Sequence, residues 1–177
     1  LAAYGTYVSA SPAFLTTVVS GAPLPTLVAV FNDATAPRLY AIRIRANGSP
    51  ESIFLSVPKD AELNTGLGSY GSTVVFGDKQ GDLQSYALGV AGAWAPTPGW
   101  PITVGAGNRS TNPVISGSTI AAGAGGTVGR MFSVAKTGGA LLFQVRPTPV
   151  WNLVSTGTAF IAGSDDSNIL IANSNLG

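Results

Sequence analysis

The feature that most constrains this chain is a repeat with a period of about 45 residues. A short apolar run of the β type ends before a polar or glycine turn four times, and the last residues of these runs are Phe31, Phe76, Ala122 and Ala162, at intervals of 45, 46 and 40 positions. Nine or ten residues after the first three of these positions, an aromatic residue heads a second run, at Tyr40, Tyr86 and Phe132. A regular period of this length indicates a stack of similar supersecondary units.

Two further strand signals complete most units. One is an apolar run with an aromatic residue at equivalent places, which are Phe54, Trp100 and Phe143. The other is a run opened by proline, which a strand tolerates best at its first residue. The prolines are Pro12, Pro113 and Pro149, and the second unit has Gly66-Leu67-Gly68 in their place. The first two units are expected to carry insertions at residues 16–25 and 91–98.

These signals predict an all-β chain in which helix is nearly absent. The 23 Gly and 12 Pro residues interrupt regular elements, and 45% hydrophobic against 10% charged residues can bury a core. Eleven strands are predicted, at residues 26–31, 38–44, 52–56, 72–77, 83–89, 99–104, 118–122, 129–135, 140–145, 158–162 and 168–173.

Four-stranded antiparallel units at this period are typical of a β-propeller, in which each unit is one blade. We therefore predict a β-propeller-like array of four antiparallel four-stranded blades in a single domain or fragment over residues 1–177. The units are expected at about 8–57, 58–104, 105–146 and 147–177. Two arrangements remain open: a closed four-blade ring, with residues 1–5 as the closing strand, or part of a seven- to eight-blade propeller.

The repeat resembles the pyrroloquinoline-quinone-type β-propeller repeat. The resemblance is carried by Asn112-Pro113-Val114-Ile115-Ser116-Gly117 with Thr137-Gly138-Gly139, and by Gly77-Asp78-Lys79-Gln80-Gly81 with Tyr86-Ala87-Leu88. It covers most of residues 8–177 and implies propeller blades, which occur in enzymes, scaffolds and adhesins alike. The closing aromatic is Phe in two units, and we do not carry the cofactor chemistry of the family over to this chain.

Charge and residue content restrict the chemistry. Nine Lys and Arg against eight Asp and Glu give a net charge of +1 without a basic run, so no nucleic-acid partner is expected. The absence of both His and Cys excludes Ser-His-Asp triads, imidazole bases and thiol catalysis. Glycine and proline split the longest uncharged stretches, so no transmembrane segment is predicted. We lean towards a protein that is not an enzyme and has no cofactor apart from calcium.

Two groups of residues are candidates for binding. Trp94 lies in an expected insertion, and Trp151 ends a strand signal, so both are candidate platforms for a sugar or a protein. Carboxylates cluster in two hairpin turns, where oxygen-rich chains can hold calcium. These candidates are Asp78, Asp82, Asp165 and Asp166. Their alternative role is to stabilise the turn. Arg43 and Arg45 are expected to be solvated.

The sequence therefore favours a non-enzymatic binding or structural module that contacts its partner through the loops between blades. A quinone-dependent dehydrogenase-like or other enzyme fragment and a carbohydrate-binding propeller lectin are the alternatives. Apolar residues at both chain ends predict that a protein partner or a second copy completes the assembly. The missing initiator Met predicts a processed product. Together with the low lysine content and the habit of the family, it favours an extracellular, periplasmic or cell-surface location.

Overall fold

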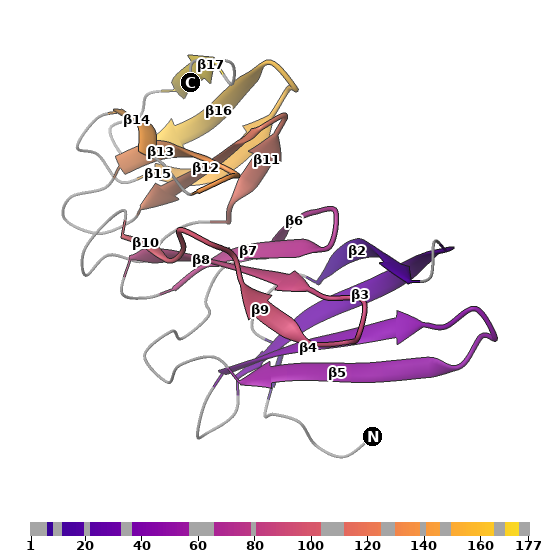
Figure 1. The fold of residues 1–177 in the computed structure, drawn as a ribbon. Coiled ribbons are helices and arrows are strands. Elements are labelled where there is room, and N and C mark those ends of the chain that lie inside the picture. The colour runs from indigo at the N-terminus through magenta and orange to yellow at the C-terminus, as the bar shows by residue number, and fades with distance from the viewer. Residues whose placement is uncertain are drawn as a thin grey trace.

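The computed structural model describes residues 7–8, 12–19, 22–32, 37–56, 66–78, 81–103, 112–124, 130–138, 141–145, 150–164 and 169–173. These residues form four antiparallel sheets that follow one another along the chain (Figure 1). The described part contains no helix, and hence none long and apolar enough to cross a membrane. The predicted all-β array is confirmed, and each of the eleven predicted strands overlaps an observed one.

The first sheet has the order β1-β3-β4-β5, and β2 pairs with β3 on the same side as β1. Its strands are β1 (Tyr7–Val8), β2 (Ala13–Val19), β3 (Ala22–Asn32), β4 (Pro37–Ile44) and β5 (Pro50–Ser56). The insertion predicted at residues 16–25 is wrong, because β2 and β3 pair through it. Pro23 and Pro25 fit in β3 because β4 begins to pair only at Thr26, so a missing N–H on the open side removes no hydrogen bond.

The second sheet has the order β10-β8-β7-β6, and β9 also pairs with β8. Its strands are β6 (Gly68–Tyr70), β7 (Thr73–Gly77), β8 (Asp82–Leu88), β9 (Trp94–Pro96) and β10 (Ile102–Thr103). The two short strands β9 and β10 pair with opposite ends of β8, so together they act as one interrupted fourth strand. Residues 91–98 therefore are not an insertion outside the blade, because they contain the first part of this strand.

The third sheet has the order β11-β12-β13-β14, and the fourth has the order β15-β16-β17. Their strands are β11 (Val114–Ser116), β12 (Thr119–Ala124), β13 (Arg130–Ala135), β14 (Leu141–Val145), β15 (Val150–Ser155), β16 (Ala159–Ser164) and β17 (Ile169–Asn173). The fourth sheet thus has three strands within the described residues. The closing strand predicted at residues 1–5 lies outside them.

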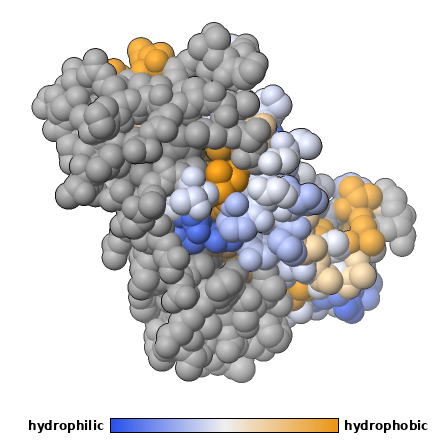
Figure 2. Space-filling view, turned by 60° about the vertical axis from the view of Figure 1, so that its left-hand side comes forward, coloured by the Kyte–Doolittle hydropathy of each residue, from blue (hydrophilic) through white to orange (hydrophobic). Residues whose placement is uncertain are grey.

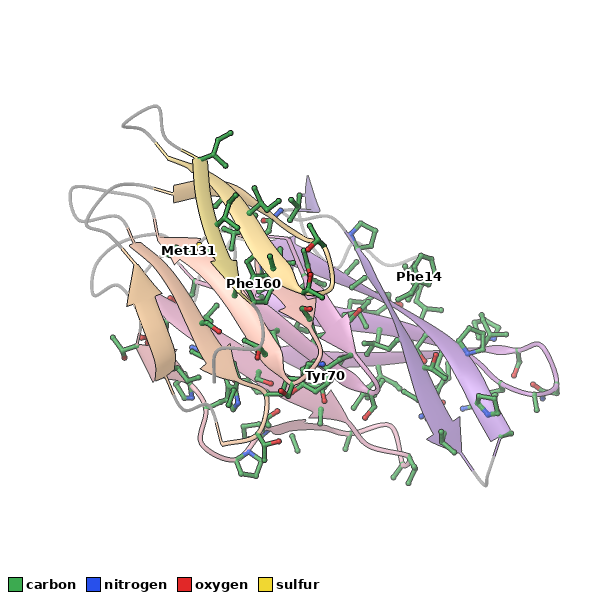
Figure 3. The ribbon with its side chains drawn as sticks, turned by 90° about the horizontal axis from the view of Figure 1, so that it is seen from above. Phe14, Tyr70, Met131 and Phe160 are labelled. Carbon is green, nitrogen blue, oxygen red and sulfur yellow. The ribbon has the colours of Figure 1, made fainter. Side chains whose placement is uncertain are left out.

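Successive sheets pack face to face and bury three apolar clusters. The first lies between sheets one and two and includes Leu15, Val28 and Phe76; the second, between sheets two and three, includes Val75, Leu83, Trp100 and Ile120. The third joins Met131 to Leu153 and Phe160, and Figure 3 shows Met131 and Phe160 side by side there. Trp100 is 8% exposed, which confirms that it belongs to the core.

Hydrogen bonds also join neighbouring sheets at their first strands and at the residues next to those strands. The Ser69 hydroxyl donates to the carbonyl oxygen of Phe14 over 3.0 Å, and the Ser116 hydroxyl donates to that of Gly157 over 2.9 Å. The Gly66 amide donates to Oδ1 of Asn112, the residue 46 positions later. Successive repeats therefore meet along their first strands, which is the stacking that a propeller requires.

The four sheets form an open arc. Close contacts run from β2 to β6 and β7, from β6 to β11, and from β11 and β12 to β15. No comparable contact joins the first sheet to the fourth among the described residues, and Figure 1 places these two sheets at opposite ends. Among the described strands, each end of the arc therefore has an outer sheet face without a neighbouring blade.

Candidate interaction surfaces

The outer face of the first sheet is apolar and exposed. Strand alternation buries Leu15 against the second sheet and turns Phe14 and Val18 outwards, where they are 73% and 53% exposed. Pairing continues this face from Phe14 to Leu27 of β3 and Ile42 of β4. We call this surface the first end face. Its members are Phe14, Thr16, Val18, Pro23, Pro25, Leu27, Ala29, Tyr40, Ile42, Ile44, Pro50 and Ser52, of which Tyr40 is buried and donates a hydrogen bond to Ser52 over 2.8 Å. None of them carries a charge.

The outer face of the fourth sheet has the same character. Val154 pairs with Ile161, and Ile161 pairs with Ile171, so the three side chains form one row across β15, β16 and β17. Val154 is 57% exposed and Ile171 is 71% exposed, and Ile169 on the same face is 74% exposed. We call this surface the second end face. Leu153 and Phe160, on the opposite side of the sheet, are buried against the third sheet.

These two end faces account for nearly all exposed large apolar side chains in the described part of the chain. Six of the seven lie on them, and the seventh is Val90, in the turn between β8 and β9. In Figure 3, Phe14 lies apart from the paired Met131 and Phe160, and Figure 2 shows apolar residues reaching the surface beside polar ones. Single exposed apolar residues are common on monomers, whereas contiguous apolar faces mark interaction sites.

A polar row crosses the inner face of the first sheet at one end. The Arg43 guanidinium donates to Oε2 of Glu51 through Nε and Nη2, over 2.9 and 2.7 Å. Arg43 is only 3% exposed, and Nη2 of the exposed Arg45 lies 3.4 Å from Oε1 of Glu51. The hydrogen bonds from Arg43 hold the pKa of the Glu51 carboxyl below its ordinary value. The expectation that Arg43 is solvated is therefore wrong, because its side chain lies on the face that packs against the second sheet.

Asp78, one of the calcium candidates, organises the hairpin turn between β7 and β8. It is 3% exposed, and its Oδ1 accepts the Asp82 amide over 2.9 Å while its Oδ2 accepts Nε2 of Gln84 over 3.1 Å. Both oxygens thus already have partners, which favours the alternative role of stabilising the turn. Asp82 contributes its backbone to this turn. Asp165 and Asp166 lie outside the described residues, so calcium binding stays a prediction, although the described part holds no cluster of three possible metal ligands.

The two tryptophan candidates occupy different surroundings. Trp94 lies in β9, is half-buried, and packs against the apolar cluster between the first two sheets. Its Nε1 is buried and has no hydrogen-bond partner among the described groups. Trp151 lies in β15, and its side chain is outside what the structure describes. A ligand role for either residue stays a prediction, and the structure does not bring the two strands together.

The sequence predicted apolar surface at both chain ends but did not identify the residues of the two end faces. The alternation of Phe14, Thr16 and Val18 with Ala13, Leu15 and Thr17 continues into residues assigned to an insertion, so the strand was not followed to its end. The outward residues of β15 to β17 are apolar like the inward ones, and periodicity alone does not distinguish a covered face from an open one. The sequence signal that points to these faces is that the first and last strands are apolar on both of their sides.

Comparison with known proteins supports the fold. No family model and no curated protein matches this chain. The computationally designed Ika4 protein is similar in structure, with a TM-score of 0.58, 15% identity, and coverage of 96% of this chain and 94% of that one. BamB from Moraxella catarrhalis gives a TM-score of 0.57 at 14% identity, and the chain covers 52% of it. A chain of the Mitotic Checkpoint Complex gives 0.62 at 11% identity, with 56% of it covered.

The chain thus spans about half the length of BamB and of the checkpoint-complex chain, while 98% of this chain is matched in each case. These neighbours are β-propellers. Together with the four stacked antiparallel sheets and the open arc, the comparisons show that the chain has the fold of a β-propeller, or of part of one.

Proposed function

We propose that this chain is a non-enzymatic protein-binding module, a single propeller domain or segment over residues 1–177 that binds through its two end faces. The observation that carries the proposal is the concentration of exposed apolar side chains on these faces. Six of the seven exposed large apolar side chains in the described residues lie there. An apolar sheet face left in water favours association with another apolar surface. The sequence predicted contacts through the loops between blades, and those loops, at residues 57–65, 104–111 and 146–149, lie outside the described residues.

The chemistry of the described polar groups supports a binding role. Arg43 and Glu51 pair with each other, and the carboxylate of Asp78 is used within its own turn. The chain has neither His nor Cys to act as a base or a thiol nucleophile. The solved structure of the Mitotic Checkpoint Complex shows a chain of similar fold within a protein assembly. We keep the pyrroloquinoline-quinone-type repeat as the proposed relationship and an extracellular, periplasmic or cell-surface location as the proposed setting.

Binding through the end faces is tested with a variant that carries a charge on each of them, Phe14→Lys together with Val154→Glu. Wild type and variant are immobilised and exposed to protein extracts from the source cells, and each bound protein is quantified. The proposal predicts a partner, which can be the chain itself, that binds wild type and does not bind the double variant. The control Val90→Lys changes an exposed side chain outside the end faces and should retain that partner. Partners retained by the double variant, or turnover abolished by changing a single Asp, would overturn it.

A further inference from the structure

We infer that a second copy of this chain covers the end faces, so that two copies close into one ring of eight sheets. The first end face of each copy packs against the second end face of the other, and this contact is made twice. The inference rests on the proposed role of the end faces as binding surfaces and names their occupant.

The packing inside the chain gives the pattern for this contact. Each internal interface joins one side of a sheet to the opposite side of the next: Val74 and Phe76 of β7 face the first sheet, whereas Val75 of the same strand faces the third. The third sheet likewise turns Ile120 towards the second sheet and Ala121 towards the fourth. Every sheet therefore has a side that receives the preceding sheet and a side that receives the following one.

The two end faces are the sheet sides that receive no other sheet among the described residues. The first end face is the side of the first sheet that would receive a preceding sheet, and the second end face is the side of the fourth sheet that would receive a following one. Val154, Ile161 and Ile171 would then meet Phe14, Leu27 and Ile42, on the first three strand positions of each sheet. The described side chains of both surfaces carry no charge and most of them are apolar, like those of the clusters already buried between sheets. A charged or strongly polar partner would bury its own polar groups against these faces without hydrogen-bond partners.

The extent of the described arc indicates how many copies of it a ring would need. The arc covers 52% of BamB and 56% of the checkpoint-complex chain, which are β-propeller chains, so two such arcs match the extent of one propeller of that size. A contact between two different patches gives a closed assembly only if the rotation between copies closes. An arc that spans half a ring closes after two copies, with a two-fold axis along the axis of the ring.

The pairing of unlike faces makes a specific prediction for charged variants. Phe14→Lys alters the first end face and Val154→Glu alters the second, and both residues are exposed, so neither change disturbs a core. In either variant alone, both contacts of a dimer contain one buried unpaired charge. In a mixture of the two, a heterodimer has one contact that is entirely wild type and a second that brings the two introduced charges, which are opposite in sign, to the same interface.

The test is sedimentation velocity of the full chain over a hundredfold range of concentration, with circular dichroism to verify that each variant is folded. We expect a dimer for wild type and for Val90→Lys, monomers for each end-face variant alone, with at least a tenfold weaker association, and recovery of dimers on mixing. Dimers that persist in one variant alone would show pairing of like faces and overturn the inference. So would a wild type that stays monomeric at every concentration.

These outcomes also separate the inference from the proposed function. A monomeric wild type that captures a different protein through faces blocked by the double variant contradicts the second copy and retains the binding role. A chain that neither self-associates nor loses a partner in the double variant contradicts both.

Discussion

At the scale of single residues, the fold depends on a few polar and glycine positions between sheets. Arg43 is buried and depends on Glu51, and Gly99 meets the next sheet at Gly138. The sequence predicted neither the burial of Arg43 nor the close approach of Gly99 to Gly138, because strand alternation does not reveal which face of a blade is covered. A charged residue in a blade strand can be on the buried side when its partner strand supplies the opposite charge.

Glu51→Gln should destabilise the chain by about 1–3 kcal/mol at neutral pH, because it leaves the buried Arg43 guanidinium without its carboxylate. The pKa of Glu51 is lowered in the folded state, so its stabilisation is present above the ordinary pKa of a glutamate and is lost as the pH falls through the lower folded value. Chemical denaturation at neutral pH and below about pH 4 measures this change, and the gap between wild type and variant should shrink in acid.

Arg45→Gln is the matched control for that prediction. Arg45 is 54% exposed in its side chain and lies 3.4 Å from Glu51, so its removal should cost less than about 1 kcal/mol. An equal loss for Arg45→Gln and Glu51→Gln, or a Glu51→Gln effect that does not change with pH, would show that the buried pair is not the cause.

Gly99→Ala should destabilise the chain more than Gly48→Ala. Both glycines have a positive φ, 83° and 79°, so both substitutions strain the backbone by about 1–2 kcal/mol. A Cβ atom on Gly99 would in addition clash with the backbone of Gly138, whereas one on Gly48 meets nothing within 4 Å. Thermal melting of both variants measures the difference, and equal losses would mean that the second and third sheets do not approach each other at Gly99.

At the scale of the strands and sheets, the sequence predicted much of the fold. The runs that end at Phe31, Phe76, Ala122 and Ala162 became β3, β7, β12 and β16, because continuous apolar runs at a fixed period signal central strands. The prediction failed where proline lies inside a strand, at Pro23 and Pro25, and where a fourth strand is split, as in β9 and β10. In both places the tertiary partner, β2 or β8, decides the structure.

Phe76→Ala should destabilise the chain by about 3–5 kcal/mol. Phe76 is fully buried between the first two sheets, and its ring stacks on Tyr86 with centroids 6.0 Å apart. Phe14→Ala, measured at a concentration where the chain is monomeric, should cost less than about 1 kcal/mol, because Phe14 is 73% exposed. Urea denaturation compares the two. A loss at Phe14 as large as that at Phe76 would contradict the assignment of Phe14 to an open face.

At the scale of the whole molecule, the sequence predicted blades but left ring closure open, because closure depends on contacts between units that no local pattern records. The structure shows an arc whose described residues form a largely apolar face at each end, in keeping with the low charge of the chain. Within a ring of eight sheets, the same residues would be core residues. The apolar outward side chains of β2 and of β15 to β17 then follow the rule that already applies to the inner sheets.

The most direct test of the end-face contact uses the absence of native cysteine. A Phe14→Cys and Val154→Cys double variant is treated with a short bifunctional thiol reagent, and the linked peptides are identified by mass spectrometry. A ring of two copies predicts covalent dimers joined between positions 14 and 154 of different copies, and no links in either single variant. Links between two copies of position 14, links within one chain, or no link at all would contradict it.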